Sequence, residues 1–132
     1  RVRARKIAGI AREIPPTEVF GAPEGEVLVV GWGSTYGSIR AAVTQMRAQG
    51  KAVSHAHVRF LNPLPTDLGE ILKRFRTVLV PEMNLGQLVR ILRSEYLVDA
   101  IGFNKVQGLP FKVSELTTRI DKILEEPSRH AQ

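Results

Sequence analysis

The sequence predicts an α/β fold, a three-layer sandwich in which a mostly parallel sheet is covered by helices on both faces. Short apolar runs rich in valine alternate along the chain with segments whose apolar residues recur every three or four positions. Continuous apolar runs are typical of strands buried on both faces, and strands that alternate with helices form parallel sheets. The length of 132 residues is that of one domain. No cysteine is present, which excludes disulfides and thiolate-bound metals in this chain.

Residues 1–25 indicate a basic connector rich in proline and glycine. The stretch IPPTEVFGAPEGE contains three prolines and two glycines, a density that neither helices nor sheets tolerate well. We expect the α/β domain to occupy residues 26–126 and a frayed tail to occupy residues 127–132. No apolar run approaches the ~18 residues of a membrane span, so no membrane association is expected.

The first strand and helix are predicted between residues 26 and 50. EVLVVGW is the strand, and Gly50 lies where a glycine commonly ends a helix. The apolar residues at helical spacing between them are Ile39, Ala42, Val43 and Met46.

The second and third units follow the same order. AVSHAHVRF alternates and predicts a strand, and the helix after it is expected to begin with Thr66 as its N-cap. TVLVPEM predicts the third strand. Asn84 is expected to cap the next helix, with Gln87 completing a capping box.

A weaker strand in VDAIGFNKVQG and a final helix in SELTTRIDKIL complete four strand–helix units. In sheets of this kind, binding crevices lie beyond the carboxyl ends of the strands. The corresponding segments here are GWGSTYGS, RFLNPLP, PEMNLGQ and NKVQGLPF. We expect any site to lie among them.

The net charge of +6 is concentrated at the beginning of the chain. Five basic residues and no acid occupy residues 1–12, which leaves a net charge of +1 for the rest (6 − 5 = 1). No aromatic residue accompanies these arginines, so a stacking platform for bases is missing. The pattern therefore favours a solvated arm over nucleic-acid binding, although a basic-armed nucleic-acid binder stays open as an alternative.

Three glycines follow the first strand with the spacing G-x-G-x-x-x-G, namely Gly31, Gly33 and Gly37. This outline is that of a dinucleotide-binding turn, yet the acid that reads a ribose is absent from the second strand. Arg59 there could accept a 2′-phosphate, so an NADP- or anion-binding module remains the alternative function. Trp32 inside the turn argues against it. The favoured interpretation is that the glycines permit a tight turn and close helix–strand packing.

No catalytic or metal-binding set emerges from the residues. His55 and His57 alternate along a predicted strand without a third ligand nearby, so they are expected to be polar residues on the surface of the sheet. Glu82 is the one acid at the carboxyl end of a strand beside a helix start, where the helix dipole already favours a carboxylate. We therefore predict no catalytic residue and no metal site in this chain.

Four segments, read together, resemble the C-terminal domain of the α subunit of 2-oxoacid:ferredoxin oxidoreductases, most closely of the 2-oxoglutarate type. They are VVGWGSTYGSIRAAV, HVRFLNPLP, VLVPEMNLGQLVRILR and VQGLPFKVSEL. The resemblance covers roughly residues 7–124, and the combination of GWGSTYG with PEMNLGQL carries it. The domain is similar to the C-terminal domain of transketolases, which implies the same fold.

The resemblance implies a cytoplasmic enzyme that oxidatively decarboxylates a 2-oxoacid to an acyl-CoA and reduces ferredoxin. Thiamine diphosphate, Mg²⁺ and an iron–sulfur cluster would lie elsewhere in the complex, with no cofactor in this chain. The expected partners are the remainder of its own α subunit and the β subunit, and the parent complex uses ferredoxin and CoA. The implied role of the domain is assembly.

From these loops we select the residues expected to make subunit contacts and those expected to be structural glycines. The interface residues are Trp32, Ser34, Thr35, Tyr36, Arg59, Asn62, Pro63, Glu82, Asn84 and Gln87. The structural glycines are Gly31, Gly33, Gly37 and Gly86.

Overall fold

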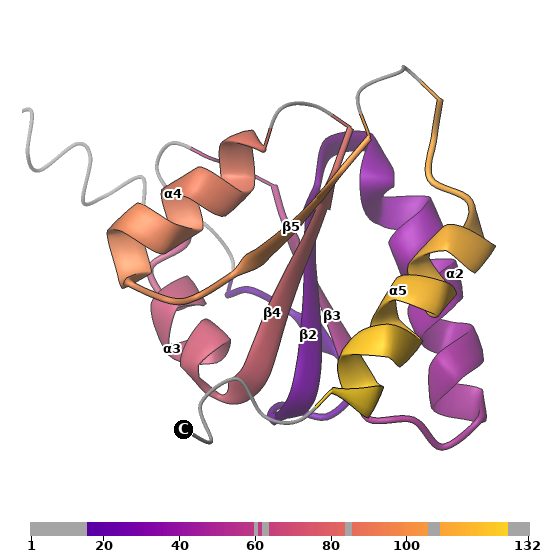
Figure 1. Cartoon of the computed structure of the whole chain (residues 1–132). Coiled ribbons are helices and arrows are strands. Elements are labelled where there is room, and N and C mark those ends of the chain that lie inside the picture. The colour runs from indigo at the N-terminus through magenta and orange to yellow at the C-terminus, as the bar shows by residue number, and fades with distance from the viewer. Residues whose placement is uncertain (1–15, 60, 62–63, 84–85, 106–108, 127–132) are drawn as a thin grey trace, which may run out of the picture.

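A five-stranded, mostly parallel sheet lies between two layers of helices in the computed structural model (Figure 1). The structure describes residues 16–59, 61, 64–83, 86–105 and 109–126. The strands are β1 (Val19–Phe20), β2 (Gly25–Trp32), β3 (Val53–Val58), β4 (Phe75–Glu82) and β5 (Ile101–Asn104). The helices are α2 (Tyr36–Ala48), α3 (Leu68–Lys73), α4 (Gln87–Tyr96) and α5 (Val113–Glu125), and a 3₁₀ turn, η1, spans Gly33–Thr35. The predicted α/β class and layer order are confirmed.

The strand order β1-β3-β2-β4-β5 places β2 at the centre of the sheet. Strands β2 to β5 are parallel, and only β1 is antiparallel to its neighbour. The chain passes from β2 to β3 on one side and then returns to β4 on the other. This reversal defines a switch point at the carboxyl ends of β2 and β4, where ligands of open α/β sheets commonly bind.

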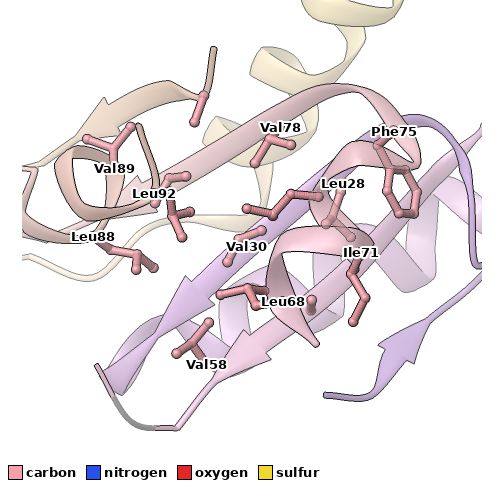
Figure 2. Close-up of a cluster of buried hydrophobic side chains, with 14 residues drawn as sticks. Leu28, Val30, Val58, Leu68, Ile71, Phe75, Val78, Leu88, Val89 and Leu92 are labelled. Atoms are coloured by element: carbon pink, nitrogen blue, oxygen red, sulfur yellow. The ribbon is translucent and has the colours of Figure 1, made fainter. Parts of the chain in front are cut away.

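Alternating side chains of the strands supply two separate cores. Helices α3 and α4 cover one face, and α2 and α5 cover the other (Figure 1). Figure 2 shows the first core, where Leu28 and Val30 of β2 meet Leu68 of α3 and Leu88 and Leu92 of α4. Val27 and Val29 of β2 point into the second core. Because β2 is buried on both faces, its sequence is a continuous apolar run.

Helix α2 follows the predicted pattern. Its buried residues are Ile39, Ala42, Val43 and Met46, as expected from their spacing. Gly50 ends the helix in a Schellman motif: its N–H donates to the carbonyl of Arg47 at 2.9 Å, and the N–H of Lys51 donates to that of Met46 at 3.1 Å.

Two predicted helix caps are wrong. Helix α3 begins at Leu68 with Asp67, not Thr66, at its N-cap. Helix α4 begins at Gln87 after Gly86, so Gln87 cannot lie three residues inside a capping box. Asn84, the predicted cap, lies outside the described residues. The first amides of α4 are bonded instead by Glu82, a residue of the preceding strand.

Strand β1 lies in the stretch where the sequence predicted only a connector. Val19 and Phe20 pair with Ala56 and His55 of β3 and so cover that edge of the sheet. Both carboxylate oxygens of Asp67 accept hydrogen bonds from Thr17, one from its N–H and one from its hydroxyl, each at 2.8 Å. The last residues of the predicted connector are therefore fastened to the sheet and to α3. Among the helices that the structure describes, none is long and apolar enough to cross a membrane.

Candidate functional site

The carboxyl ends of β2 and β4 form the centre of the candidate site. Ladder pairing between these strands ends at Val29 and Leu79, before either strand ends. Pro81 lies two residues further along β4 and has no N–H to donate. The last residues of the two strands are joined by a side-chain hydrogen bond instead. The indole Nε1–H of Trp32 donates to Glu82 Oε1 at 2.9 Å.

Glu82 is almost completely buried, with 1% of its surface exposed, and accepts three hydrogen bonds. Besides the indole, the N–H of Leu88 donates to Oε1 at 2.7 Å and the N–H of Val89 donates to Oε2 at 3.0 Å. These amides belong to the first turn of α4, where the helix dipole favours a negative charge. One carboxylate thus connects β2, β4 and α4.

This arrangement determines what the switch point can do chemically. Both oxygens of Glu82 accept hydrogen bonds from donors of the chain itself, so the carboxylate serves as a cap for the first turn of α4. Trp32 is half-buried and packs against the core under α3 and α4. Ser34 extends the contact between the two loops, since its hydroxyl lies 3.5 Å from the sulfur of Met83. At the carboxyl ends of β2 and β4, the described residues Trp32, Glu82, Leu88 and Val89 are thus hydrogen-bonded to one another.

Glycine is required at some of the predicted positions and not at others, for different physical reasons. A Cβ at Gly31 would lie 2.5 Å from Ile39 Cδ1 and 2.9 Å from Thr35 Oγ1, so close helix–strand packing requires glycine there. Gly86 has a φ of 90° and Gly33 a φ of 66°, a backbone conformation that other residues rarely adopt. At Gly37 a Cβ would meet nothing within 4 Å. The structure gives no steric requirement for glycine at position 37.

A second cluster lies beside the switch point, where α2 crosses β3. Tyr36, His55 and His57 form a triangle of rings with centroids 5.0 to 6.1 Å apart. The guanidinium of Arg40 stacks on Tyr36 at 5.1 Å and on Phe20 of β1 at 4.1 Å. The sequence analysis did not predict Arg40 and Phe20 at this place. Phe20 reaches Arg40 of α2 only because β1 pairs with β3, a strand that was not predicted from the sequence to have this neighbour.

His55 is held neutral in this cluster. Its Nδ1 accepts a hydrogen bond from Arg40 Nε at 3.3 Å, and its Nε2 has no partner among the described residues. Burial, followed by the positive charges of Arg40 and His57, lowers the pKa of His55 from 6.5 to about 3. Burial and the nearby Arg59 and Arg40 also lower the pKa of His57. The two histidines lie on one face, as predicted, and the described residues contain no group of three potential metal ligands.

The remaining predicted interface residues that the structure describes are partly buried and partly exposed. Thr35 is buried, and its hydroxyl donates to the carbonyl of Trp32 at 2.9 Å. Ser34, Tyr36, Arg59 and Gln87 are exposed around the carboxyl edge of the sheet. Asn62 and Pro63, like Asn84, lie outside the described residues. Met83 was missed, although its place directly after Glu82 was a usable signal.

Comparison with known proteins gives consistent relatives. Residues 25–109 match the family model of pyruvate:ferredoxin oxidoreductase core domain II. The chain is 48% identical over 117 residues to the 2-oxoglutarate oxidoreductase subunit KorA of Mycobacterium tuberculosis. These residues are 88% of this chain and 18% of the relative. It is 33% identical over 129 residues to the alpha subunit of 2-oxoacid:ferredoxin oxidoreductase 2 of Aeropyrum pernix, covering 93% and 20%. The chain thus spans about a fifth of the length of these relatives.

Two solved structures share the fold. The 2-oxoglutarate:ferredoxin oxidoreductase from Magnetococcus marinus, determined with 2-oxoglutarate, coenzyme A and succinyl-CoA bound, superposes with a TM-score of 0.84 and 29% identity over 89% of this chain and 21% of that one. A split gene transketolase in an inactive beta4 tetramer gives a TM-score of 0.61 at 21% identity, over 84% and 42%. The second likeness shows the fold alone and confirms that it is transketolase-like.

Replacing Glu82 by glutamine is expected to destabilise the domain. A glutamine has one acceptor oxygen and would direct an NH₂ group at amide or indole donors, so we expect a loss of about 2–4 kcal/mol in the free energy of unfolding. Glu95→Gln, at an exposed position of the same helix, is the control and should change stability by less than ~0.5 kcal/mol. Urea unfolding measures both. Equal effects of the two variants would contradict the structural role of Glu82.

The glycine turn is tested by a matched pair of alanine variants. Gly31→Ala forces a methyl group against Ile39 and Thr35 and should destabilise the domain by about 1–3 kcal/mol. Gly37→Ala should be neutral or stabilise by up to ~1 kcal/mol, because alanine is the better helix former at a position with free space. Thermal melting of both variants checks this order of stability. A Gly31→Ala variant that melts at a higher temperature than Gly37→Ala would contradict the prediction.

The stability of the domain should fall as the pH is lowered from 7 to 5. His55 has a pKa of about 3 in the folded chain and an ordinary value of 6.5, so the folded state resists a proton that the unfolded state takes up. The contribution of neutral His55 is complete above pH 6.5 and decreases below it, by at most ~1.4 kcal/mol per pH unit. Urea unfolding at pH 7, 6 and 5 should show this slope, and His55→Leu should flatten it more than His57→Gln does. An unchanged slope in His55→Leu would contradict the assignment.

Proposed function

The chain belongs to the family of pyruvate:ferredoxin oxidoreductase core domain II, and from this premise we propose its function. We propose that it is a non-catalytic assembly domain in the α subunit of a 2-oxoacid:ferredoxin oxidoreductase. The enzyme would be of the 2-oxoglutarate type. The complete enzyme would oxidatively decarboxylate a 2-oxoacid to an acyl-CoA and reduce ferredoxin. The partners of this chain would be the remainder of its own α subunit and the β subunit, in the cytoplasm.

One observation carries the assembly role. At the switch point, where an α/β domain of this order would bind a ligand, the acid at the end of β4 is engaged internally: Glu82 accepts hydrogen bonds from the Trp32 indole and from two amides of α4. What the same edge presents outward are exposed side chains of several loops, among them Ser34, Tyr36 and Arg59. Such a surface is suited to contact with another protein domain.

The residues of this chain do not fit the cofactors that the enzyme family implies. An iron–sulfur cluster needs cysteine ligands, and the sequence contains none. The described part of the chain offers no cluster of acids and histidines for the Mg²⁺ that accompanies thiamine diphosphate, and Glu82 is already engaged by three donors. We therefore assign no chemical step to the domain, and propose that it keeps active sites formed elsewhere in register. A misplacement of catalytic groups by about 1 Å can cost on the order of a hundredfold in rate.

A charge reversal at the carboxyl edge tests this role. Arg59 is exposed directly after β3, and Arg59→Glu should weaken association of the chain with the rest of the oxidoreductase by about tenfold, the size expected for a lost interfacial charge. Lys73→Glu should leave association unchanged, because Lys73 is exposed at the end of α3, near the amino end of β4 and away from the carboxyl ends of the strands. Association is measured by titration of the assembly, and activity by 2-oxoglutarate- and CoA-dependent reduction of a viologen dye.

The titration of the assembly and the activity assay together separate an effect on assembly from an effect on catalysis. An assembly domain predicts that activity per assembled complex is the same in Arg59→Glu and in the unaltered chain. A complex that forms normally but turns over far more slowly would contradict the proposal. A chain that remains alone and melts at a higher temperature with NADPH would instead support nucleotide binding at the glycine turn.

A further inference from the structure

The two edges of the sheet are treated differently by this chain. The outer edge of β3 is covered by β1, which pairs with it through Val19 and Phe20. Strand β5 forms the opposite edge, and within the part of the chain that the structure describes no strand lies beyond it. Figure 1 shows β5 running along the outside of β4 with α4 on one side and α5 on the other. An uncovered edge is a template for pairing with a further strand.

The hydrogen-bonding groups at this edge follow from the pairing with β4. The N–H of Lys105 donates to the carbonyl of Glu82 at 2.8 Å, so Lys105 and the alternate residue Phe103 direct their backbone groups at β4. Because successive residues of a strand direct their backbone groups to opposite sides, Gly102 and Asn104 direct theirs away from the sheet. Gly102 has no side chain, which leaves its backbone open to an approaching strand.

A cation lies next to this edge without a counter-charge. The guanidinium of Arg119 on α5 stacks on the ring of Phe103 of β5 at 5.5 Å. Its Nε is buried and has no hydrogen-bond partner, and no carboxylate of the described residues pairs with it. The neighbouring Lys105 is already paired with Glu115 at 2.7 Å. A buried donor of this kind is unfavourable until an acceptor reaches it.

The two most exposed leucines of the described chain flank β5 along the sequence. Leu97, four residues before the strand, is 88% exposed, and Leu109, five residues after it, is 60% exposed. Leu97 also has a φ of 54°, a left-handed conformation that is unfavourable for leucine. Single exposed apolar residues are common on protein surfaces, so these two leucines do not by themselves identify an interface.

We propose that β5 receives an extended, acidic segment from another part of the oxidoreductase, which adds a strand beside Gly102 and Asn104 and places a carboxylate on Arg119. This inference rests on the proposed function and names the kind of contact that the assembly domain makes. A second copy of this chain is the poorer occupant, because it would bring a second Arg119 to the same edge. A strand of four residues makes a small contact, so it would contribute to a larger interface.

Hydrogen exchange at the amides of β5 tests the proposal. In the chain alone, Phe103 and Lys105 should exchange slowly, and Gly102 and Asn104 should exchange fast. In the assembled oxidoreductase, Gly102 and Asn104 should become at least about tenfold better protected, as expected for newly paired amides. Arg119→Glu should weaken association by about tenfold, whereas Lys122→Glu, one turn away on the exposed side of α5, should change it by less than about twofold. Thermal melting verifies that both variants fold.

Each outcome has one meaning. An assembly that forms while Gly102 and Asn104 still exchange fast overturns this inference and leaves the proposed function intact. If no assembly forms, the proposed function fails as well. Protection that appears in the isolated chain only at high concentration would identify a second copy as the occupant and would also overturn the inference. If Arg119→Glu is folded and associates normally, no carboxylate binds Arg119.

Discussion

The carboxylate of Glu82 is the interaction on which the carboxyl side of the domain depends. Parallel strands β2 and β4 stop pairing before they end, and no further ladder bond holds their last residues together. A single buried side chain replaces that ladder by accepting from Trp32 of β2 and from two amides of α4. A buried charge is stable only where such donors surround it, so the position of the glycine turn, the end of β4 and the start of α4 are determined together.

This constraint also accounts for the packing of the glycine turn, which resembles a nucleotide-binding turn. Gly31 is required because Ile39 and Thr35 pack directly against it, and the amides of α4 are occupied by an internal acid. The geometry shared with nucleotide-binding folds arises from the packing of a helix on a parallel strand. In this domain the same geometry brings Trp32 and Glu82 into hydrogen-bond contact at the carboxyl ends of β2 and β4.

The two side edges of the sheet, β3 and β5, are built differently. At the β3 edge, β1 pairs with β3, and Thr17 donates two hydrogen bonds to Asp67. At the β5 edge, no further strand pairs with β5 within the described residues, and Arg119 Nε has no hydrogen-bond partner among them. The sheet is therefore covered at the β3 edge and open at the β5 edge in the part of the chain that the structure describes.

The sequence by itself determined the class of fold, the order of four strand–helix units and the buried face of α2, because burial on both faces of a strand and on one side of a helix leaves a periodic record in neighbouring residues. It also singled out Trp32, Glu82 and Gly31 as residues of the carboxyl edge. Only the tertiary structure decided what they do. The bond from Trp32 to Glu82 joins residues 50 apart. The strand at Val19 and Phe20 and the correct caps at Asp67 and Gly86 likewise depend on partners distant in sequence or on backbone conformation. Local patterns record burial, but they do not record which distant donor will satisfy a buried acceptor.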